Sequence, residues 1–154
     1  MMRVVDILSV ETIVPRLQSR TKVGALRELS EALVRHHPDV PADRLLDVLL
    51  DREKLGTTAI GEGIAIPHGK LHGLTKVIAA FGRIPEGVDF ESLDGAPTKL
   101  VFMLVAPEDS AGVHLKALAR ISRLLKDRGF RERLLEAEAR EQLYQIIREE
   151  DERL

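Results

Sequence analysis

The side chains best placed for chemistry lie in one segment, Gly61-Glu-Gly-Ile-Ala-Ile-Pro-His-Gly-Lys70, with His68 near its end. Pro67 fixes φ before the histidine and Gly69 lets the next peptide turn freely, so we expect an unobstructed imidazole at a rigid strand end. Neutral imidazole is a nucleophile near pH 7, and a backbone carbonyl can fix one ring nitrogen so that the other faces a substrate. The segment favours a phosphoryl acceptor over a histidine that only caps a turn.

Two further side chains could assist such an acceptor. Arg52 precedes the glycine-rich segment, and a guanidinium can hold two phosphoryl oxygens at once; its alternative role is a surface ion pair with Asp47, Asp51 or Glu53. His114 opens an expected helix after a buried strand, at a sheet edge where a helix N-terminus offers N–H groups to an anion. Its alternative role is a partly buried cap residue, and both alternatives stay open at this point.

The other histidines favour structural roles. His72 lies four residues after His68, but the flanking proline and glycines argue against the helix that a His-x-x-x-His metal pair needs. We therefore expect His72 on the surface and no metal site. His36 and His37 lie at the end of an expected helix, where imidazolium interacts favourably with the helix dipole.

Composition limits the class of protein. The chain has 154 residues, 44% hydrophobic and 31% charged, which predicts one domain over residues 1–154, with a core at about 5–149 and a charged tail at 148–154. With 23 Lys and Arg against 25 Asp and Glu, the formal charge is −2. Nucleic-acid-binding domains usually carry a basic excess, so we do not expect a nucleic acid as partner. The absence of cysteine excludes disulfides, thiolate metal sites and thiol nucleophiles.

The sequence also lacks signals for membranes and nucleotides. No apolar run reaches the roughly 20 residues that a membrane helix needs, and no signal peptide is visible, so we expect a cytoplasmic protein without membrane insertion. Gly61-x-Gly63 is not a dinucleotide motif, because Ile66 occupies the third glycine position, and no phosphate-binding P-loop is present. We therefore expect no cofactor, and a phosphoryl donor that is another protein rather than ATP.

The pattern of apolar residues predicts an α/β domain with a mixed sheet and helices on both faces. Expected helices cover residues 21–37, 41–52, 111–126 (with Ser110 as cap), 131–137 and 140–149, and expected strands cover residues 77–84 and 100–106, with one or two short strands in 4–17. Residues 55–69 are expected to form a long structured loop with at most a short strand at 64–66. The basic run at 120–133 is interpreted as a solvated helix face, with a docking surface as the alternative.

Several stretches together resemble one known family. They are Leu50-Asp-Arg-Glu-Lys-Leu-Gly-Thr-Thr, Gly-Ile-Ala-Ile-Pro-His68-Gly-Lys, Asp89-Phe90 with Asp94-Gly95-Ala-Pro97, the strand Leu-Val-Phe-Met-Leu-Val-Ala-Pro, and His114-Leu-Lys-Ala-Leu-Ala. The sequence resembles enzyme IIA of the bacterial phosphoenolpyruvate phosphotransferase system, fructose/mannitol type, and most closely its nitrogen-regulatory branch. The resemblance covers residues 21–149 and includes the spacing of Arg52 and His114 from His68.

The resemblance implies that His68 accepts a phosphoryl group on Nε2 from the phosphohistidine of an HPr-like phosphocarrier protein. It implies that Arg52 and His114 steady that group, that Glu62 lies near the pocket, and that the mixed sheet has about five strands. The nitrogen-regulatory branch implies regulation of target proteins by phosphorylation state.

Two other functions are alternatives: a sugar-transport IIA that passes phosphate to a IIB domain, and a binding module in which His68 is never phosphorylated. We favour the regulatory phosphocarrier because no permease segment is visible and because the chain, with its long N-terminal helix and Ala-Ile-Pro-His-Gly-Lys-Leu, resembles the nitrogen-related branch. Ile64, Ile66 and Leu71 are candidate partner contacts around His68. The sequence leaves the oligomeric state open.

Overall fold

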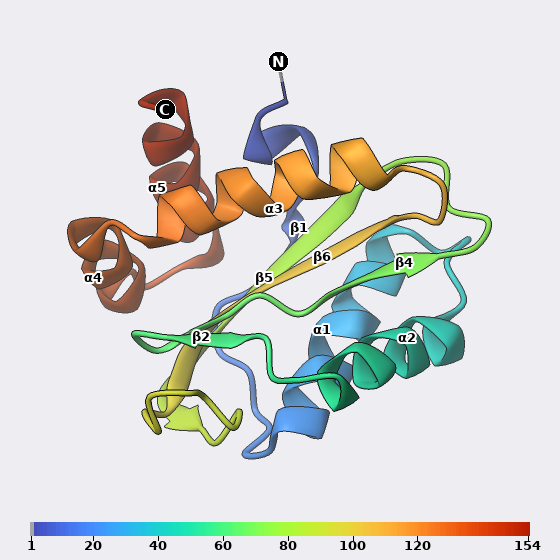
Figure 1. The fold of residues 1–154 in the computed structure, drawn as a ribbon. Coiled ribbons are helices and arrows are strands. Elements are labelled where there is room, and N and C mark those ends of the chain that lie inside the picture. Colours follow the sequence, from blue (N-terminus) through green and yellow to red (C-terminus); the bar gives the residue numbers. More distant parts are fainter. Residues whose placement is uncertain (1) are drawn as a thin grey trace.

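A computed structural model describes residues 2–154 and shows an α/β fold with a mixed sheet between two helical layers (Figure 1). The helices are the 3-10 turn Val4–Asp6, α1 (Lys22–His36), α2 (Ala42–Lys54), α3 (Ala111–Leu125), α4 (Arg128–Glu136) and α5 (Arg140–Glu152). The strands are β1 (Leu8–Val14), β2 (Ala59–Gly61), β3 (Ile64–Ala65), β4 (His68–Leu71), β5 (Ile78–Val88) and β6 (Thr98–Pro107).

The sheet has six strands in the order β1-β5-β6-β3-β2, with β4 also paired to β6. β5 and β6 are antiparallel at its centre, while β1 pairs with β5 and both β3 and β4 pair with β6 in parallel. Two central strands were expected from the sequence, and this prediction is confirmed. Residues 2–154 form six strands, close to the number of about five that the resemblance implies.

Strand β6 shows why the strand sequence does not alternate between apolar and polar residues. Leu100, Phe102 and Leu104 face the core formed with α3, α4 and α5, whereas Val101 and Met103 face the core formed with α1 and α2. Successive side chains of a strand point to opposite faces, so a strand covered on both faces is apolar throughout. The predicted arrangement of helices on both faces is confirmed.

Most helix boundaries lie within a few residues of those expected. Thr21 caps α1, its side chain accepting a hydrogen bond from the Gly24 N–H at 3.0 Å. Pro41 is the N-cap of α2 rather than its first residue. Ser110 occupies the N-cap position of α3 without capping it, because its hydroxyl donates to the Pro107 carbonyl at 2.7 Å instead.

Two segments differ from their predicted structure. Residues 55–69 contain the short strands β2 and β3 and the start of β4 instead of a long loop with one strand. Glycine and proline lower the strand propensity of this segment, so the sequence did not predict these strands. The edge of β6 that does not pair with β5 supplies the backbone partners of β3 and β4. The amino-terminal segment forms a 3-10 turn and one strand.

The expected charged tail is part of helix α5. Asp151 is 1% exposed; its carboxylate accepts the Val4 N–H at 2.7 Å and pairs with Arg120 Nε at 2.6 Å. These partners lie far away in sequence, so the local charge run gave no sign of them. Buried carboxylates persist where they are paired and hydrogen-bonded in this way.

Candidate active site

His68 is the first residue of β4, opposite Leu104 of β6. Its Nδ1 lies 2.8 Å from the Ile66 carbonyl oxygen. Because a carbonyl oxygen can only accept, Nδ1 carries the ring proton and donates, which leaves the lone pair of the neutral ring on Nε2. The ring is thus fixed in one tautomer with Nε2 as the nucleophilic atom.

Arg52 reaches this nitrogen from the end of α2. Its Nε lies 3.4 Å from His68 Nε2, and its Nη1 donates to the Gly56 carbonyl at 2.9 Å. In the described residues, no carboxylate of Asp47, Asp51 or Glu53 pairs with Arg52, so the surface ion pair considered as its alternative is wrong.

The glycine after His68 has a different role from the expected one. Gly69 does not adopt a positive φ. A Cβ at this position would lie 2.6 Å from Val48 Cγ1 of α2, which is closer than atoms can approach without a shift. The glycine therefore allows α2 to pack tightly on β4, and this close packing positions Arg52 beside His68.

His114 contributes from the other helical layer, in the first turn of α3. Its ring centroid lies 5.5 Å from that of His68, with the planes inclined at 51°. The residue is 7% exposed, and its Nδ1 is buried without a hydrogen-bond partner. Arg52, His68 and His114 therefore meet at one place, as predicted, although they come from three separate elements.

The surroundings of both histidines favour the neutral form of the ring. Burial lowers the pKa of His68 from its ordinary value of 6.5; the hydrogen bond to Ile66 opposes this effect, and the charge of Arg52 adds to it. Burial also lowers the pKa of His114, and the neighbouring His68 and Lys70 lower it further. A neutral His68 keeps the Nε2 lone pair available near pH 7.

Glu62 lies apart from this cluster. It occupies the turn between β2 and β3 with φ 58°, and its carboxylate lies 3.6 Å from Arg131 Nη2 of α4. Among residues 2–154, no ion pair within 4 Å joins Glu62 to His68 or His114. Its role near the phosphoryl group remains a prediction.

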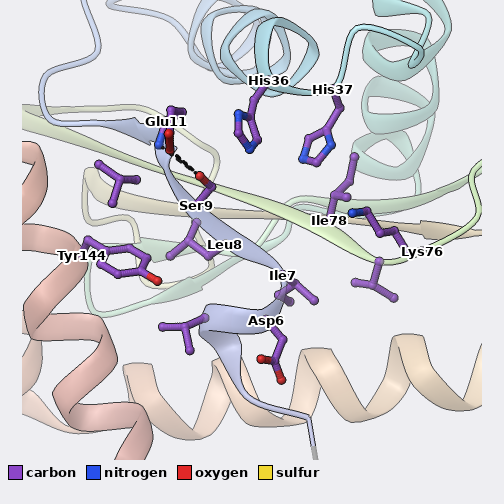
Figure 2. A pocket seen from close by; sticks show the side chains of 13 residues that line it. Asp6, Ile7, Leu8, Ser9, Glu11, His36, His37, Lys76, Ile78 and Tyr144 are labelled. Atoms are coloured by element: carbon purple, nitrogen blue, oxygen red, sulfur yellow. Dashed lines mark hydrogen bonds between the residues drawn. The ribbon is translucent and has the colours of Figure 1, made fainter.

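The remaining histidines lie elsewhere. His72 is exposed, with its Nδ1 2.9 Å from Glu108 Oε2. His36 and His37 extend from the end of α1 into a pocket of about 400 Å³ beside β1, at the edge of the sheet away from β4 (Figure 2). No group of three or more His, Cys, Asp or Glu suited to a metal ion occurs in the described part of the chain.

Comparisons with known proteins place this geometry in a family. Residues 6–150 match the family described as "Phosphoenolpyruvate-dependent sugar phosphotransferase system, EIIA 2". The chain belongs to this enzyme IIA family. The resemblance noted in the sequence is therefore confirmed.

This enzyme IIA is similar to several known proteins, including the following three. A nitrogen regulatory protein of Bradyrhizobium diazoefficiens is 44% identical over 146 residues, covering 95% of each chain. The crystal structure of nitrogen regulatory protein IIA-Ntr from Neisseria meningitidis superposes with a TM-score of 0.86 at 32% identity, covering 92% of this chain and 97% of that one. The mannitol enzyme IIA of Escherichia coli, in complex with phosphorylated enzyme IIB, has a TM-score of 0.76 at 26% identity, covering 93% and 99%.

The described part of this enzyme IIA contains no helix long and apolar enough to span a membrane. Sequence reasoning missed two buried residues next to the site, Glu53 and Thr58. Glu53 was considered only as an ion-pair partner of Arg52, but it is buried and binds Lys22 and Thr58 instead. The only sequence signal was a carboxylate at a helix end followed five residues later by a threonine.

Proposed function

We propose that this enzyme IIA is a phosphocarrier that accepts a phosphoryl group on His68 Nε2 from the phosphohistidine of an HPr-like protein. The observation that carries the proposal is the orientation of His68: Nδ1 is held by the Ile66 carbonyl, and Nε2 faces Arg52. The family match supports a role in phosphoryl transfer.

The transfer balances without a nucleotide. The Nε2 lone pair attacks phosphorus as the P–N bond of the donor breaks, and that bonding pair returns to the donor imidazole. The imidazole of His68 becomes cationic, and its Nδ1 proton stays hydrogen-bonded to the Ile66 carbonyl. The Arg52 guanidinium stabilises the negative phosphoryl oxygens in transit, which is the main task in phosphoryl transfer.

The surface around the site suits a protein donor. Leu55, directly after α2, is 85% exposed, and Val113 and Leu115 flank His114 with 44% and 64% exposed. These exposed apolar side chains, near Arg52 and His114 in sequence, are candidates for contact with a protein partner. Ile64, Ile66 and Leu71, the expected partner contacts, are at most 4% exposed and belong to the core, so that prediction is wrong.

The nitrogen-regulatory role is supported by the names of two similar proteins. Phosphorylation of His68 would add about −1.5 to −2 charges to the site and so change which target proteins the surrounding surface complements. The sugar-transport alternative, transfer to a IIB domain, is favoured by the mannitol enzyme IIA solved with phosphorylated IIB.

The test is intact-mass spectrometry at neutral to basic pH, after incubation with phosphoenolpyruvate, enzyme I and phosphocarriers of the sugar and nitrogen kinds. We expect one added phosphate on the wild type and on His72→Ala, an exposed control outside the site, and none on His68→Ala. A phosphate retained by His68→Ala would refute the site.

The same experiment separates the alternatives. Faster labelling by the nitrogen-type carrier would support regulation, whereas faster labelling by the sugar-type carrier with onward transfer to IIB would support transport. If neither carrier labels the protein, the remaining function is that of a binding module in which His68 is never phosphorylated.

A further inference from the structure

We propose that Glu53 is a positioning residue of the His68 site: through Thr58 and Ile66 it fixes the imidazole in the tautomer that presents Nε2. This inference deepens the proposed function and rests on it. Glu53 does not touch the reacting nitrogen, so it acts through a chain of hydrogen bonds.

This series of hydrogen bonds begins at the buried carboxylate of Glu53. The side chain of Glu53 is 5% exposed and lies 3.0 Å from Lys22 Nζ. The carboxylate accepts the Thr58 N–H at 3.0 Å and also the Thr58 hydroxyl. Thr58 is itself 4% exposed. Two hydrogen bonds from one residue to an ionised group are stronger than neutral ones and fix both its backbone and its side chain.

The chain continues through backbone groups to the imidazole. The Thr58 carbonyl accepts the Ile66 N–H at 3.1 Å, and the Ile66 carbonyl accepts His68 Nδ1–H at 2.8 Å. Glu53 therefore orients Thr58, Thr58 orients Ile66, and Ile66 selects the tautomer of His68. An acceptor that holds the distal ring nitrogen is the usual means of orienting a reactive histidine.

The other partner of His68 is tied to the same turn. The Gly56 N–H donates to the Glu53 carbonyl at 3.1 Å, and the Gly56 carbonyl accepts Arg52 Nη1 at 2.9 Å. The turn at the end of α2 thus holds both the group that faces Nε2 and the chain that fixes Nδ1. A shift of this turn would misplace both sides of the imidazole together.

A second carboxylate partner of Lys22, that of Glu91, offers a matched control for this series of hydrogen bonds. Lys22 Nζ lies 3.2 Å from Glu91 Oε1 and 5.0 Å from the centroid of the Phe90 ring. The Glu91 side chain is 73% exposed and makes no hydrogen bond to Thr58 in the described residues. Glu91→Gln therefore removes one carboxylate from Lys22 while leaving the path to His68 in place.

The decisive experiment measures the tautomer of His68 in the unphosphorylated, full-length protein by ¹⁵N NMR of the ring nitrogens. Wild type and Glu91→Gln should hold the proton on Nδ1. Thr58→Val and Glu53→Gln should shift a measurable fraction of the ring to the Nε2–H form. Thr58→Ser, which keeps the hydroxyl, should restore the Nδ1–H form.

Transfer kinetics provide the second measurement. In variants that remain folded by circular dichroism, Glu53→Gln and Thr58→Val should lower kcat about tenfold, with KM for the phosphocarrier unchanged, because misplacement of the nucleophile affects the chemical step. Thr58→Ser should keep the wild-type kcat, because serine retains the hydroxyl that donates to Glu53.

The two proposals can fail separately. An unchanged tautomer and unchanged kcat in folded Glu53→Gln and Thr58→Val would overturn the role of Glu53 while leaving phosphorylation of His68 intact. If the tautomer shifts in Glu53→Gln and Thr58→Val but no carrier phosphorylates the wild type, the proposed function would be overturned while the hydrogen-bond chain would be supported.

Discussion

Two arginines of this fold, Arg52 and Arg83, differ in the partners of their guanidinium groups. Arg83 is 7% exposed, and its guanidinium donates to the backbone carbonyls of Pro15, Leu134 and Ala137. Arg52 donates one hydrogen bond to a carbonyl, that of Gly56, and directs its Nε at the imidazole of His68.

The difference separates structural from chemical use of the same side chain. The carbonyls around Arg83 belong to the segment after β1 and to the end of α4, so its hydrogen bonds hold these parts to β5. All of these partners are backbone carbonyls of the folded chain. Arg52 faces His68 Nε2, the atom proposed to receive the phosphoryl group. A guanidinium in that position can bind the negative oxygens of an arriving phosphoryl group.

The largest expected effect is the loss of folding stability when Arg83 is replaced. Arg83→Met leaves buried carbonyls without donors and should lower the free energy of unfolding by about 3 kcal/mol. In thermal unfolding this corresponds to a decrease in Tm of roughly 10 °C. The rate of phosphoryl acceptance per folded molecule should stay at the wild-type value; a slowed rate would break the contrast with Arg52.

The same substitution at Arg52 should have the reverse outcome. Arg52→Met removes the charge that faces the phosphoryl group and should slow acceptance about 100-fold in rapid-quench kinetics. Stability should change by less than about 0.5 kcal/mol. Arg52→Lys should recover only part of the rate, because an ammonium cannot hold two oxygens in the manner of a guanidinium. Full recovery by lysine would reduce the role of Arg52 to charge alone.

A smaller effect concerns pH. Protonation removes the Nε2 lone pair, and burial together with Arg52 lowers the pKa of His68. The ring therefore stays neutral to lower pH, and the acceptance rate should fall to half its maximum below pH 6.5, the ordinary pKa of histidine. Arg52→Met should move this midpoint upward, whereas Arg83→Met should leave it unchanged. The measurement is the rate of acceptance across pH 5 to 8, and a midpoint above 6.5 in the wild type would contradict the environment described for His68.

The sequence predicted the parts of this fold that depend on local patterns. Helix α1 follows from its apolar period, the central strands from their uninterrupted apolar runs, and the place of His68 at a strand end from its neighbours. The residues that the sequence did not reveal act through contacts between distant segments. The burial of Asp151 requires Val4 and Arg120, and the short strands β3 and β4 require the edge of β6.

Glu53 illustrates the same limit inside the site. A glutamate near the end of a charged helix is ordinarily a surface residue. Its burial depends on Lys22, thirty-one positions earlier in the chain, and on the turn that brings Thr58 back over the helix end. No periodicity or motif contains that information.

The hydrogen bond between the Val4 N–H and the Asp151 carboxylate joins positions separated by 147 residues. During synthesis, Val4 cannot meet Asp151 until α5 has left the ribosome. The layer formed by α3, α4 and α5 is therefore closed late, after the segments that carry Arg52, His68 and His114 have already been made. Contacts between residues so far apart in sequence are slow to form, so the contact between Val4 and Asp151 forms after all three residues of the site have been synthesised.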